Sequence, residues 1–364
     1  MNSNIKKIFE ICKENNNKYT FYSEGVHYQK YFYTYIQLLS KNKKKIIYLS
    51  SEKKDKINLE YVENIYIGNG ILRYLVFLFV KSKLFFLTTT DLDNNILKKN
   101  SNIKNYIYVF HAAQSTHKGY TKNAFNNYHS ILCVGNYHNH EIKKTENLYN
   151  LSKKKLINSG YFYFDYLLQY GNFNITENYI LIAPSWNYNK NNFLNIECEK
   201  LIELLINKNY KIIFRPHPEH FKRSKLVLDK IYSKFKKFSN FKVDLDKDNI
   251  SSLEKSYTLI TDNSGIAIEY MLIFQKPVVY FDQFSKIHND NYVNLKIEAF
   301  EDKVKDEFGY SINQTNLEDF EQEIKKANDN FIKKKPLIRN FIKSNFYNFG
   351  NTSEYIFKYF NNED

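Results

Sequence analysis

Short apolar runs, rich in β-branched and aromatic residues, alternate with polar segments or segments of helical periodicity through most of this chain. This alternation is typical of βαβ units built around a parallel sheet. The expected strands are Tyr19–Ser23, Lys45–Ser50, Val62–Ile67, Leu84–Thr88, Tyr106–Phe110, Ile131–Val134, Leu156–Ser159, Tyr179–Ala183, Tyr210–Phe214, Phe241–Val243, Thr258–Thr261 and Val278–Phe281. The expected helices are Val26–Ser40, Ile196–Asn207, Lys222–Phe238, Ser251–Ser256, Gly265–Phe274, Leu317–Asn330 and Pro336–Phe349.

The length of the chain, 364 residues, corresponds to about two domains at roughly 150 residues each. The segment Gln169–Asn178 carries Gly and Asn without apolar periodicity near mid-chain, so we expect a linker there. These features predict an α/β protein with two lobes, residues 1–170 and 171–330, each containing a parallel sheet. A helical extension is expected at residues 331–364.

Lysine dominates the positive charge of the chain. The 53 Lys and Arg residues exceed the 39 Asp and Glu residues by 14, and only Arg73, Arg215, Arg223 and Arg339 are arginines. A net positive charge suits an anionic partner such as nucleic acid, an acidic membrane surface or a phosphorylated substrate. The abundance of Asn, Ile, Tyr and Phe indicates an AT-rich coding bias and favours the alternative, a solvated Lys-rich surface.

Hydrophobic residues make up 43% of the chain, which excludes a disordered protein. The three cysteines lie far apart, so we expect a reducing compartment and neither structural disulfides nor a Cys-based zinc site. The N-terminus lacks the apolar core of a secretory signal. The most apolar stretch, residues 71–90, is interrupted by basic residues. We therefore expect a cytoplasmic protein in which this stretch forms a buried helix and a buried strand.

The segment Tyr210–His220, YKIIFRPHPEH, predicts a strand that ends in Arg215 and His217, each followed by proline. Ligands of open α/β sheets bind at the carboxyl ends of strands. A guanidinium fork matches phosphate oxygens, and an imidazole can donate a hydrogen bond or a proton near neutral pH. The segment therefore predicts an anion-binding site. The alternative is a proline-rich turn with a surface arginine.

A second segment, Ser256–Asp282, predicts a strand, the sequence Asp-Asn-Ser-Gly and then an apolar helix. Ser264 and the Gly265 amide would lie at the helix N-terminus, where N–H groups and the helix dipole favour phosphate. Asp262 or Ser264 can instead act as an ordinary N-cap. Glu269, one turn into the helix, is placed to accept hydrogen bonds from ribose hydroxyls, or it is a solvated helix residue.

Together these segments resemble the CDP-glycerol glycerophosphotransferase family, the teichoic-acid primases and polymerases. The motif Arg-Pro-His-Pro at Arg215 is followed by a strand, by Thr-Asp-Asn-Ser-Gly at Thr261 and by an apolar helix that leads to Lys-Pro-Val. Two other segments are similar to family motifs. Ile180–Trp186, ILIAPSW, resembles a strand ending in A-P-[ST]-W, and Gly160–Asp165, GYFYFD, stands where the family has G-x-P-R-x-D.

The resemblance implies a GT-B fold, in which two Rossmann-like lobes bind a nucleotide-activated donor, largely on the C-terminal lobe. It implies His111 and His217 as catalytic residues, although His111 is followed here by Ala-Ala-Gln-Ser where the family has Gly-Thr-Pro. The residues implied for donor and phosphate binding are Arg215, Thr261, Asp262, Ser264, Gly265, Glu269 and Ser185, and those implied for the acceptor side are Lys118 and Asp165.

The implied reaction is attack of an acceptor hydroxyl on the β-phosphorus of the donor, with His111 as candidate general base. Arg215, His217 and the helix N-terminus at Ser264 and Gly265 would neutralise the pyrophosphate and the departing CMP.

Three histidines, His129, His138 and His140, raise the alternative of a metal site. No Cys or carboxylate at ligand spacing completes such a site, and Gly-rich loops of dinucleotide enzymes and P-loop ATPases are absent, so we expect no metal and no cofactor.

The aromatic segment Tyr28–Tyr35 can contact a membrane-linked acceptor or lipid, or it can form the core of the first helix. Because the basic residues are scattered and no RNA-binding motif is present, nucleic acid is not an expected partner.

The family resemblance implies a transferase that moves glycerol phosphate or another polyol phosphate from a CDP-activated donor to a hydroxyl of a bacterial surface glycan or lipid-linked acceptor. The glycan would belong to a capsule, a teichoic acid or a lipooligosaccharide, and the enzyme would contact the inner face of the cytoplasmic membrane. Two alternatives stay open: a GT-B glycosyltransferase that uses a CMP- or UDP-sugar, and a non-catalytic polyanion-binding protein on a transferase scaffold.

Overall fold

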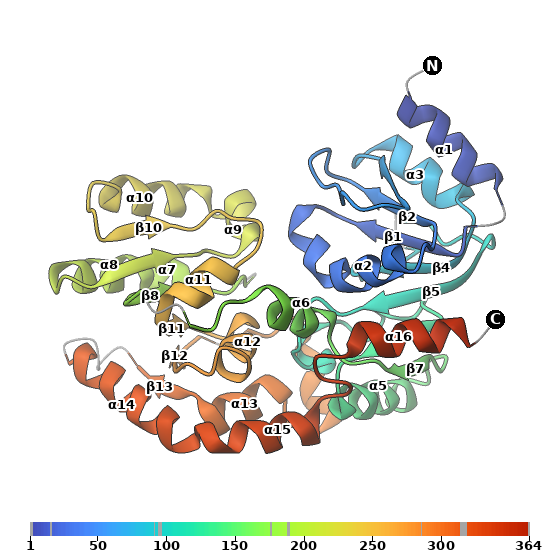
Figure 1. Ribbon diagram of the computed structural model, residues 1–364. Coiled ribbons are helices and arrows are strands. Elements are labelled where there is room, and N and C mark those ends of the chain that lie inside the picture. Colours follow the sequence, from blue (N-terminus) through green and yellow to red (C-terminus); the bar gives the residue numbers. More distant parts are fainter. Residues whose placement is uncertain are drawn as a thin grey trace. The chain divides into compact units, whose positions relative to one another are not determined.

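The computed structural model describes residues 3–14, 17–90, 92–93, 97–174, 177–187, 190–284, 286–313 and 319–362. The chain divides into two units, and Figure 1 labels most of their elements. The first unit contains Met1–His111, Tyr120–Gln169 and Asn345–Asp364, and the second contains Ala112–Gly119 and Tyr170–Ser344.

The first unit is built on a parallel sheet whose described strands lie in the order β3-β2-β1-β4-β5-β6-β7. The strands are β1 (Tyr19–Ser23), β2 (Ile46–Ser50), β3 (Val62–Tyr66), β4 (Ser82–Leu87), β5 (Ile103–Val109), β6 (Ser130–Cys133) and β7 (Lys155–Asn158). Its helices are α1 (Ser3–Lys13), η1 (Val26–Tyr31), α2 (Tyr33–Lys41), α3 (Ile71–Phe79), α5 (Asn136–Leu148), α6 (Phe162–Tyr170) and α16 (Thr352–Asn361).

The second unit has a parallel sheet in the order β10-β9-β8-β11-β12-β13 among its described strands. The strands are β8 (Tyr179–Ile182), β9 (Lys211–Phe214), β10 (Phe241–Val243), β11 (Ser256–Thr261), β12 (Val278–Phe281) and β13 (Tyr310–Ile312). Its helices are α4 (Thr116–Gly119), α7 (Phe193–Ile196), α8 (Cys198–Asn207), α9 (Pro218–Arg223), α10 (Lys225–Phe235), α11 (Ile250–Lys255), α12 (Ile266–Leu272), η2 (Asp290–Leu295), α13 (Phe300–Phe308), α14 (Phe320–Lys334), η4 (Lys335–Leu337) and α15 (Ile338–Asn345).

Both sheets have the burial that parallel strands require, and the predicted α/β class is confirmed. Every residue of β1, β2, β8 and β12 is buried, because helices cover both faces of such a sheet. In the first core the rings of Phe21 and Phe86 stack with their centroids 4.6 Å apart. Burial of a large apolar side chain contributes about 1.5–3 kcal/mol, so these runs of buried residues set the register of the strands.

The division into units differs from the expected one at two places. The C-terminal residues do not form a separate extension, because α14 contacts β12 and β13 in the second unit, whereas α16 packs against α2 in the first. The segment Ala112–Gly119 belongs to the second unit although strands β5 and β6, which flank it in sequence, belong to the first.

Two expected helices also differ from the observed ones, and β13 and α5 were not expected. The predicted helix Val26–Ser40 is interrupted, because η1 ends at Tyr31 and α2 begins at Tyr33. The short strand β13 was not predicted, and neither was the polar helix α5, which buries His138, Glu141 and Glu146 beside Ile142. The start of the predicted helix Leu317–Asn330 lies outside the described residues, and α14 continues from Phe320 to Lys334.

Candidate functional site

The strand order of the second sheet reverses between β8 and β11. The strands that follow β8 are added on one side of it, and those that follow β11 are added on the other side. Ligands of open α/β sheets bind beyond the carboxyl ends of the strands at such a reversal. Three of the predicted site residues lie there. Asp262 accepts hydrogen bonds from the backbone N–H and from the Oγ of Ser185, both at 2.7 Å, and the Oγ of Thr261 donates to the Ala183 carbonyl at 2.6 Å. The ends of β8 and β11 are therefore tied together by side chains.

Asp262 is a buried carboxyl group, 2% exposed. Its burial raises the pKa, while the two hydrogen bonds from Ser185 and the nearby Lys286 ammonium oppose this shift by favouring the ionised form. Burial lowers the pKa of the Lys286 side chain, whereas the nearby carboxylates of Asp262 and Glu301 raise it. Lys286 lies in no motif of the sequence, so this lysine is an addition to the predicted site.

Two histidines near Ser185 and Trp186 were also not predicted. His220 is fully buried, its Nε2 lies 3.0 Å from the Ser185 carbonyl and its ring meets the Trp186 ring edge-on at 5.3 Å. Burial lowers the pKa of His220. Burial and the Lys286 ammonium lower the pKa of His288 to about 4. Both imidazoles are therefore neutral at pH 7, and neither adds positive charge to the site.

His217 and Arg215 lie on the same motif but have different surroundings. The exposed His217 is the N-cap of α9, and its Nδ1 accepts a hydrogen bond from the Glu219 N–H at 3.2 Å. Because Nδ1 accepts, the neutral ring carries its proton on Nε2, which can donate to an anion. The Arg215 guanidinium instead contacts the Asp244 carboxylate at 2.5 Å and the Asp246 carbonyl at 2.9 Å.

This pairing gives Arg215 a structural task. Its side chain is only 12% exposed and that of Asp244 is 10% exposed, so the two charges largely compensate each other and fix the turn after β10. Phosphate binding by Arg215 stays a prediction, and the donor would have to share the guanidinium with Asp244.

The loop before α12 contains the predicted phosphate site at Ser264 and Gly265. Gly265 is the N-cap of α12 and its first turn has no side-chain cap. Asp262 does not serve as that cap, since its carboxylate is taken by Ser185. Glu269 is 3% exposed, so the alternative of a solvated helix residue is wrong. Its contact with ribose stays a prediction, as does phosphate binding at Ser264 and Gly265.

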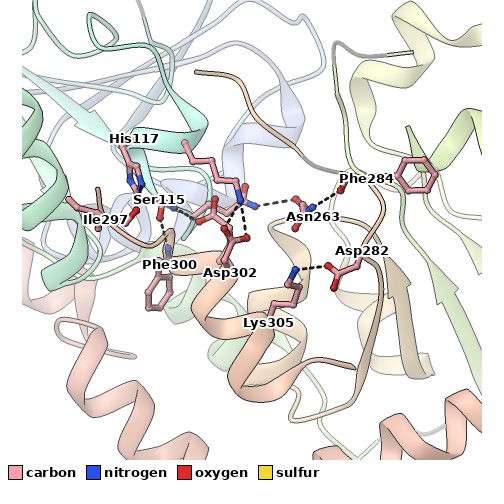
Figure 2. Close-up of polar contacts among 12 residues, drawn as sticks. Ser115, His117, Asn263, Asp282, Phe284, Ile297, Phe300, Asp302 and Lys305 are labelled. Atoms are coloured by element: carbon pink, nitrogen blue, oxygen red, sulfur yellow. Dashed lines mark hydrogen bonds and ion pairs between the residues drawn. The ribbon is translucent and has the colours of Figure 1, made fainter. Parts of the chain in front are cut away.

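The segment Ala112–Gly119 packs against the start of α13, as Figure 2 shows. Lys118 contacts both oxygens of Asp302, at 2.9 and 2.6 Å. The Nε2 of Gln114 donates to the Asn263 carbonyl, 3.2 Å away, in the loop before α12. Lys118, which the sequence analysis assigns to the acceptor side, thus lies in the same unit as the predicted donor residues.

His111 lies in the first unit, just beyond the carboxyl end of β5. Its half-buried ring is surrounded by the rings of Tyr28, Tyr31 and Tyr120, with centroids 5.7, 6.0 and 6.5 Å away. Aromatic rings at these distances restrict the orientation of the imidazole. The segment Tyr28–Tyr35 contributes to this cluster and to the core, because Phe32 and Tyr35 are fully buried.

Asp165 has a clear structural task in the first unit. Its carboxylate accepts hydrogen bonds from the N–H groups of Thr352 and Ser353, at 3.2 and 2.8 Å, at the start of α16. Burial raises its pKa, and these donors oppose the shift. A carboxylate that caps a helix stabilises it by about 1 kcal/mol. The acceptor-side role predicted for Asp165 is untouched by this observation and stays a prediction.

The three histidines considered for a metal site are not grouped around a shared position. His138 is buried on α5 with its ring 4.0 Å from that of Phe110, and the Nδ1 of His129 accepts from the Tyr106 N–H at 2.9 Å. No cluster of three His, Cys, Asp or Glu residues suited to a metal occurs among the described residues.

The chain was compared with protein families and with solved structures. A family model described as CDP-Glycerol:Poly(glycerophosphate) glycerophosphotransferase matches residues 8–358. A structure of the wall teichoic acid polymerase TagF, soaked with CDPG, is similar with a TM-score of 0.61 and 17% identity, over 97% of this chain and 91% of that one. None of the curated proteins compared matches the chain.

UDP-GlcNAc 2-epimerases are similar in structure as well. The enzyme from Methanocaldococcus jannaschii, in complex with UDP-GlcNAc and UDP, has a TM-score of 0.58 and 14% identity over 94% of this chain and 99% of that one. The enzyme from Neisseria meningitidis, bound to UDP-GlcNAc, has a TM-score of 0.59 and 13% identity with the same coverage of both chains. At these identities the likeness establishes the fold, and the predicted GT-B fold is confirmed.

Proposed function

Because this chain belongs to the CDP-glycerol:poly(glycerophosphate) glycerophosphotransferase family, and is therefore a transferase, we propose that it transfers glycerol phosphate from CDP-glycerol to a hydroxyl of a bacterial surface glycan. The observation that carries this proposal is the group of residues at the reversal of the second sheet. Asp262 and Ser185 tie the strand ends there, and Lys286 lies close enough to Asp262 to favour its ionised form.

In the proposed reaction, His111 takes the proton of the acceptor hydroxyl as its oxygen attacks the β-phosphorus of the donor. A new bond forms between that oxygen and phosphorus, and the bond from phosphorus to the bridging oxygen breaks. CMP leaves with the bridging oxygen. The Nε2–H of His217 and the Nζ hydrogens of Lys286 would stabilise the negative charge on the pyrophosphate. The proposal needs no cofactor, because the donor is already activated.

The proposal is tested by binding and turnover with a panel of donors. CDP-glycerol is expected to raise the melting temperature of the full chain and to yield CMP when a polyol-phosphate or glycan acceptor is added. CDP-ribitol, CMP-sugars and UDP-sugars are the matched comparisons. Stabilisation by a UDP- or CMP-sugar alone would replace this function with glycosyl transfer. If no nucleotide raises the melting temperature and the protein binds RNA in a salt-sensitive manner, the function is that of a polyanion-binding protein.

We also propose that the enzyme works in the cytoplasm, in peripheral contact with the inner face of the membrane. No helix in the described part of the chain has the length and apolar character needed to cross a bilayer. The support for a surface contact comes from α1 and α3, which lie side by side (Figure 1). Helix α3 is buried only in part. It buries Val76 and Phe77, but Ile71 is 79% exposed, and Tyr74, Leu75 and Phe79 are exposed on the same face.

The adjacent helix α1 exposes Ile5 and Phe9, and we call these six side chains the α1–α3 surface. Residues 3–13 and 71–83 contain six cations and one carboxylate, Glu10. An apolar face of this kind with a basic surround fits a bilayer that contains anionic lipid.

The double variant Leu75→Glu/Phe79→Glu is expected to bind vesicles of phosphatidylglycerol more than tenfold more weakly than the wild type, because each lost apolar contact costs about 2 kcal/mol. Sedimentation with vesicles measures this loss. Leu226→Glu, at a position that is 86% exposed on α10 in the second unit, is the matched control and should bind like the wild type. Two results would contradict the proposed surface. One is that the double variant binds the vesicles as strongly as the wild type. The other is that the wild type binds vesicles of pure phosphatidylcholine as strongly as those of phosphatidylglycerol.

A further inference from the structure

The segment Ala112–Gly119 is fixed to the start of α13 by reciprocal hydrogen bonds (Figure 2). The Oγ of Ser115 accepts from the Phe300 N–H at 2.5 Å, and the Ser115 N–H donates to the Glu301 carboxylate at 2.7 Å. The two bonds are reciprocal, as in a capping box, but they involve the first two residues of α13, and the serine comes from a distant part of the sequence. One turn further along the segment, Lys118 binds both oxygens of Asp302.

The ion pair of Lys118 and Asp302 is more protected from solvent than an ordinary surface pair. The Lys118 side chain is 8% exposed and that of Asp302 is 32% exposed, whereas the Lys222 side chain, which pairs with Glu219, is 72% exposed. Removing one partner of a protected pair leaves a desolvated charge behind, while an exposed pair contributes little. Ser115 and Lys118 therefore anchor the side of the segment that faces α13, while the backbone carbonyls of His117 and Lys118 accept hydrogen bonds from Asn289 and His288.

The same segment contacts the loop Asp262–Gly265, which we call the donor loop. The Gln114 amide donates to the Asn263 carbonyl at 3.2 Å, and the Asn263 side chain donates to the Phe284 carbonyl at 2.6 Å (Figure 2). A methyl group placed on Gly265 would lie 3.5 Å from the Gln114 side chain, in ordinary van der Waals contact. The donor loop is thus held between Gln114 and the residues that follow β12.

We propose that Lys118 and Asp302 are positioning residues for the donor loop. By anchoring the segment, they hold Gln114 against the Asn263 carbonyl and keep Ser264 and the Gly265 amide in a fixed position toward a donor phosphate. The identity of the donor rests on the proposed function, but the fixing of the loop does not. This inference moves Lys118 from the acceptor side, where the sequence placed it, to the donor site.

The first test is hydrogen exchange of the full-length protein without any ligand. Lys118→Met and Asp302→Asn are expected to speed exchange at the amides of residues 262–268 by about tenfold or more, while strand β9 keeps its protection. Lys222→Met, which removes a cation from the exposed pair with Glu219, should leave both regions unchanged. Unchanged exchange at residues 262–268 in both Lys118→Met and Asp302→Asn would overturn the inference.

The second test measures the dissociation constant of CDP-glycerol by calorimetry. Lys118→Met and Gln114→Ala should each weaken binding about tenfold, and the double variant should be no weaker than the worse single variant, because both act through one contact. The exchanged pair Lys118→Asp/Asp302→Lys should recover part of the affinity, which a merely destabilised protein would not do. Additive losses, or no recovery, would contradict the inference. If the wild type fails to bind CDP-glycerol, the proposed function fails and the exchange experiment still decides the role of the pair.

Discussion

His111→Ala is expected to lower kcat for glycerol phosphate transfer by about 10³-fold, within the range of 10²–10⁴ that general bases contribute. The affinity for CDP-glycerol should change by less than about twofold. The reason is that His111 lies in the first unit among Tyr28, Tyr31 and Tyr120, and none of the predicted donor residues belongs to that cluster. Steady-state kinetics together with calorimetric titration of the donor separates the two effects.

The matched control for this variant is His140→Ala, which removes an exposed imidazole from α5 in the same unit and should leave kcat unchanged. Tyr31→Phe keeps the ring that packs on His111 and should retain most of the activity. A loss of more than tenfold in donor affinity in His111→Ala would reassign this residue to phosphate binding, and an unchanged kcat would remove it from the reaction.

The strands were predictable because a parallel strand that is covered on both faces has a nearly continuous run of apolar residues in the sequence. β1, β10 and β12 have the predicted bounds, and the other predicted strands differ by a few residues at their ends. The helix α5 escaped prediction for the opposite reason. Its sequence NYHNHEIKKTENL buries polar residues such as His138 and Glu141, so hydropathy does not mark its inner face.

The sequence predicts which kinds of side chain lie at the candidate site, but it does not predict which residues these side chains bind. The sequence marks Asp262 as a residue at a strand end, whereas its bond to Ser185 joins residues 77 positions apart. The ion pair of Lys118 with Asp302 spans 184 positions, and neither residue lies in a motif with the other. Such pairings depend on the close approach of distant segments, which periodicity and local spacing do not encode.

Arg215 lies in a well-marked motif, but its bonding partner could not be predicted from the sequence either. The sequence predicts a guanidinium at the end of a strand and correctly places it after β9. What the sequence does not indicate is the competitor for that guanidinium, Asp244, at the end of β10, the strand next to β9. The outward-facing donor in the motif is therefore His217, and the second large effect is expected there.

His217→Asn is expected to lower kcat/KM for CDP-glycerol by about 10³-fold or more, with the melting temperature nearly unchanged. His217 has two tasks, which this variant separates. Its Nδ1 caps α9 by accepting from the Glu219 N–H, and its Nε2–H is the group that we expect to donate to a phosphate. An asparagine side chain is also a good N-cap, so it keeps the first task and loses the second.

His217→Ala should show the same kinetic loss and, in addition, a lower melting temperature, because removal of an N-cap costs about 1 kcal/mol. The two variants thus give equal kinetics and unequal stability if the imidazole acts on the donor. If His217→Asn keeps kcat/KM within about tenfold of the wild type while His217→Ala does not, the residue serves only to start α9. The Arg-Pro-His-Pro motif would then be a structural turn, and the stabilisation of the pyrophosphate would fall to Lys286 and the donor loop.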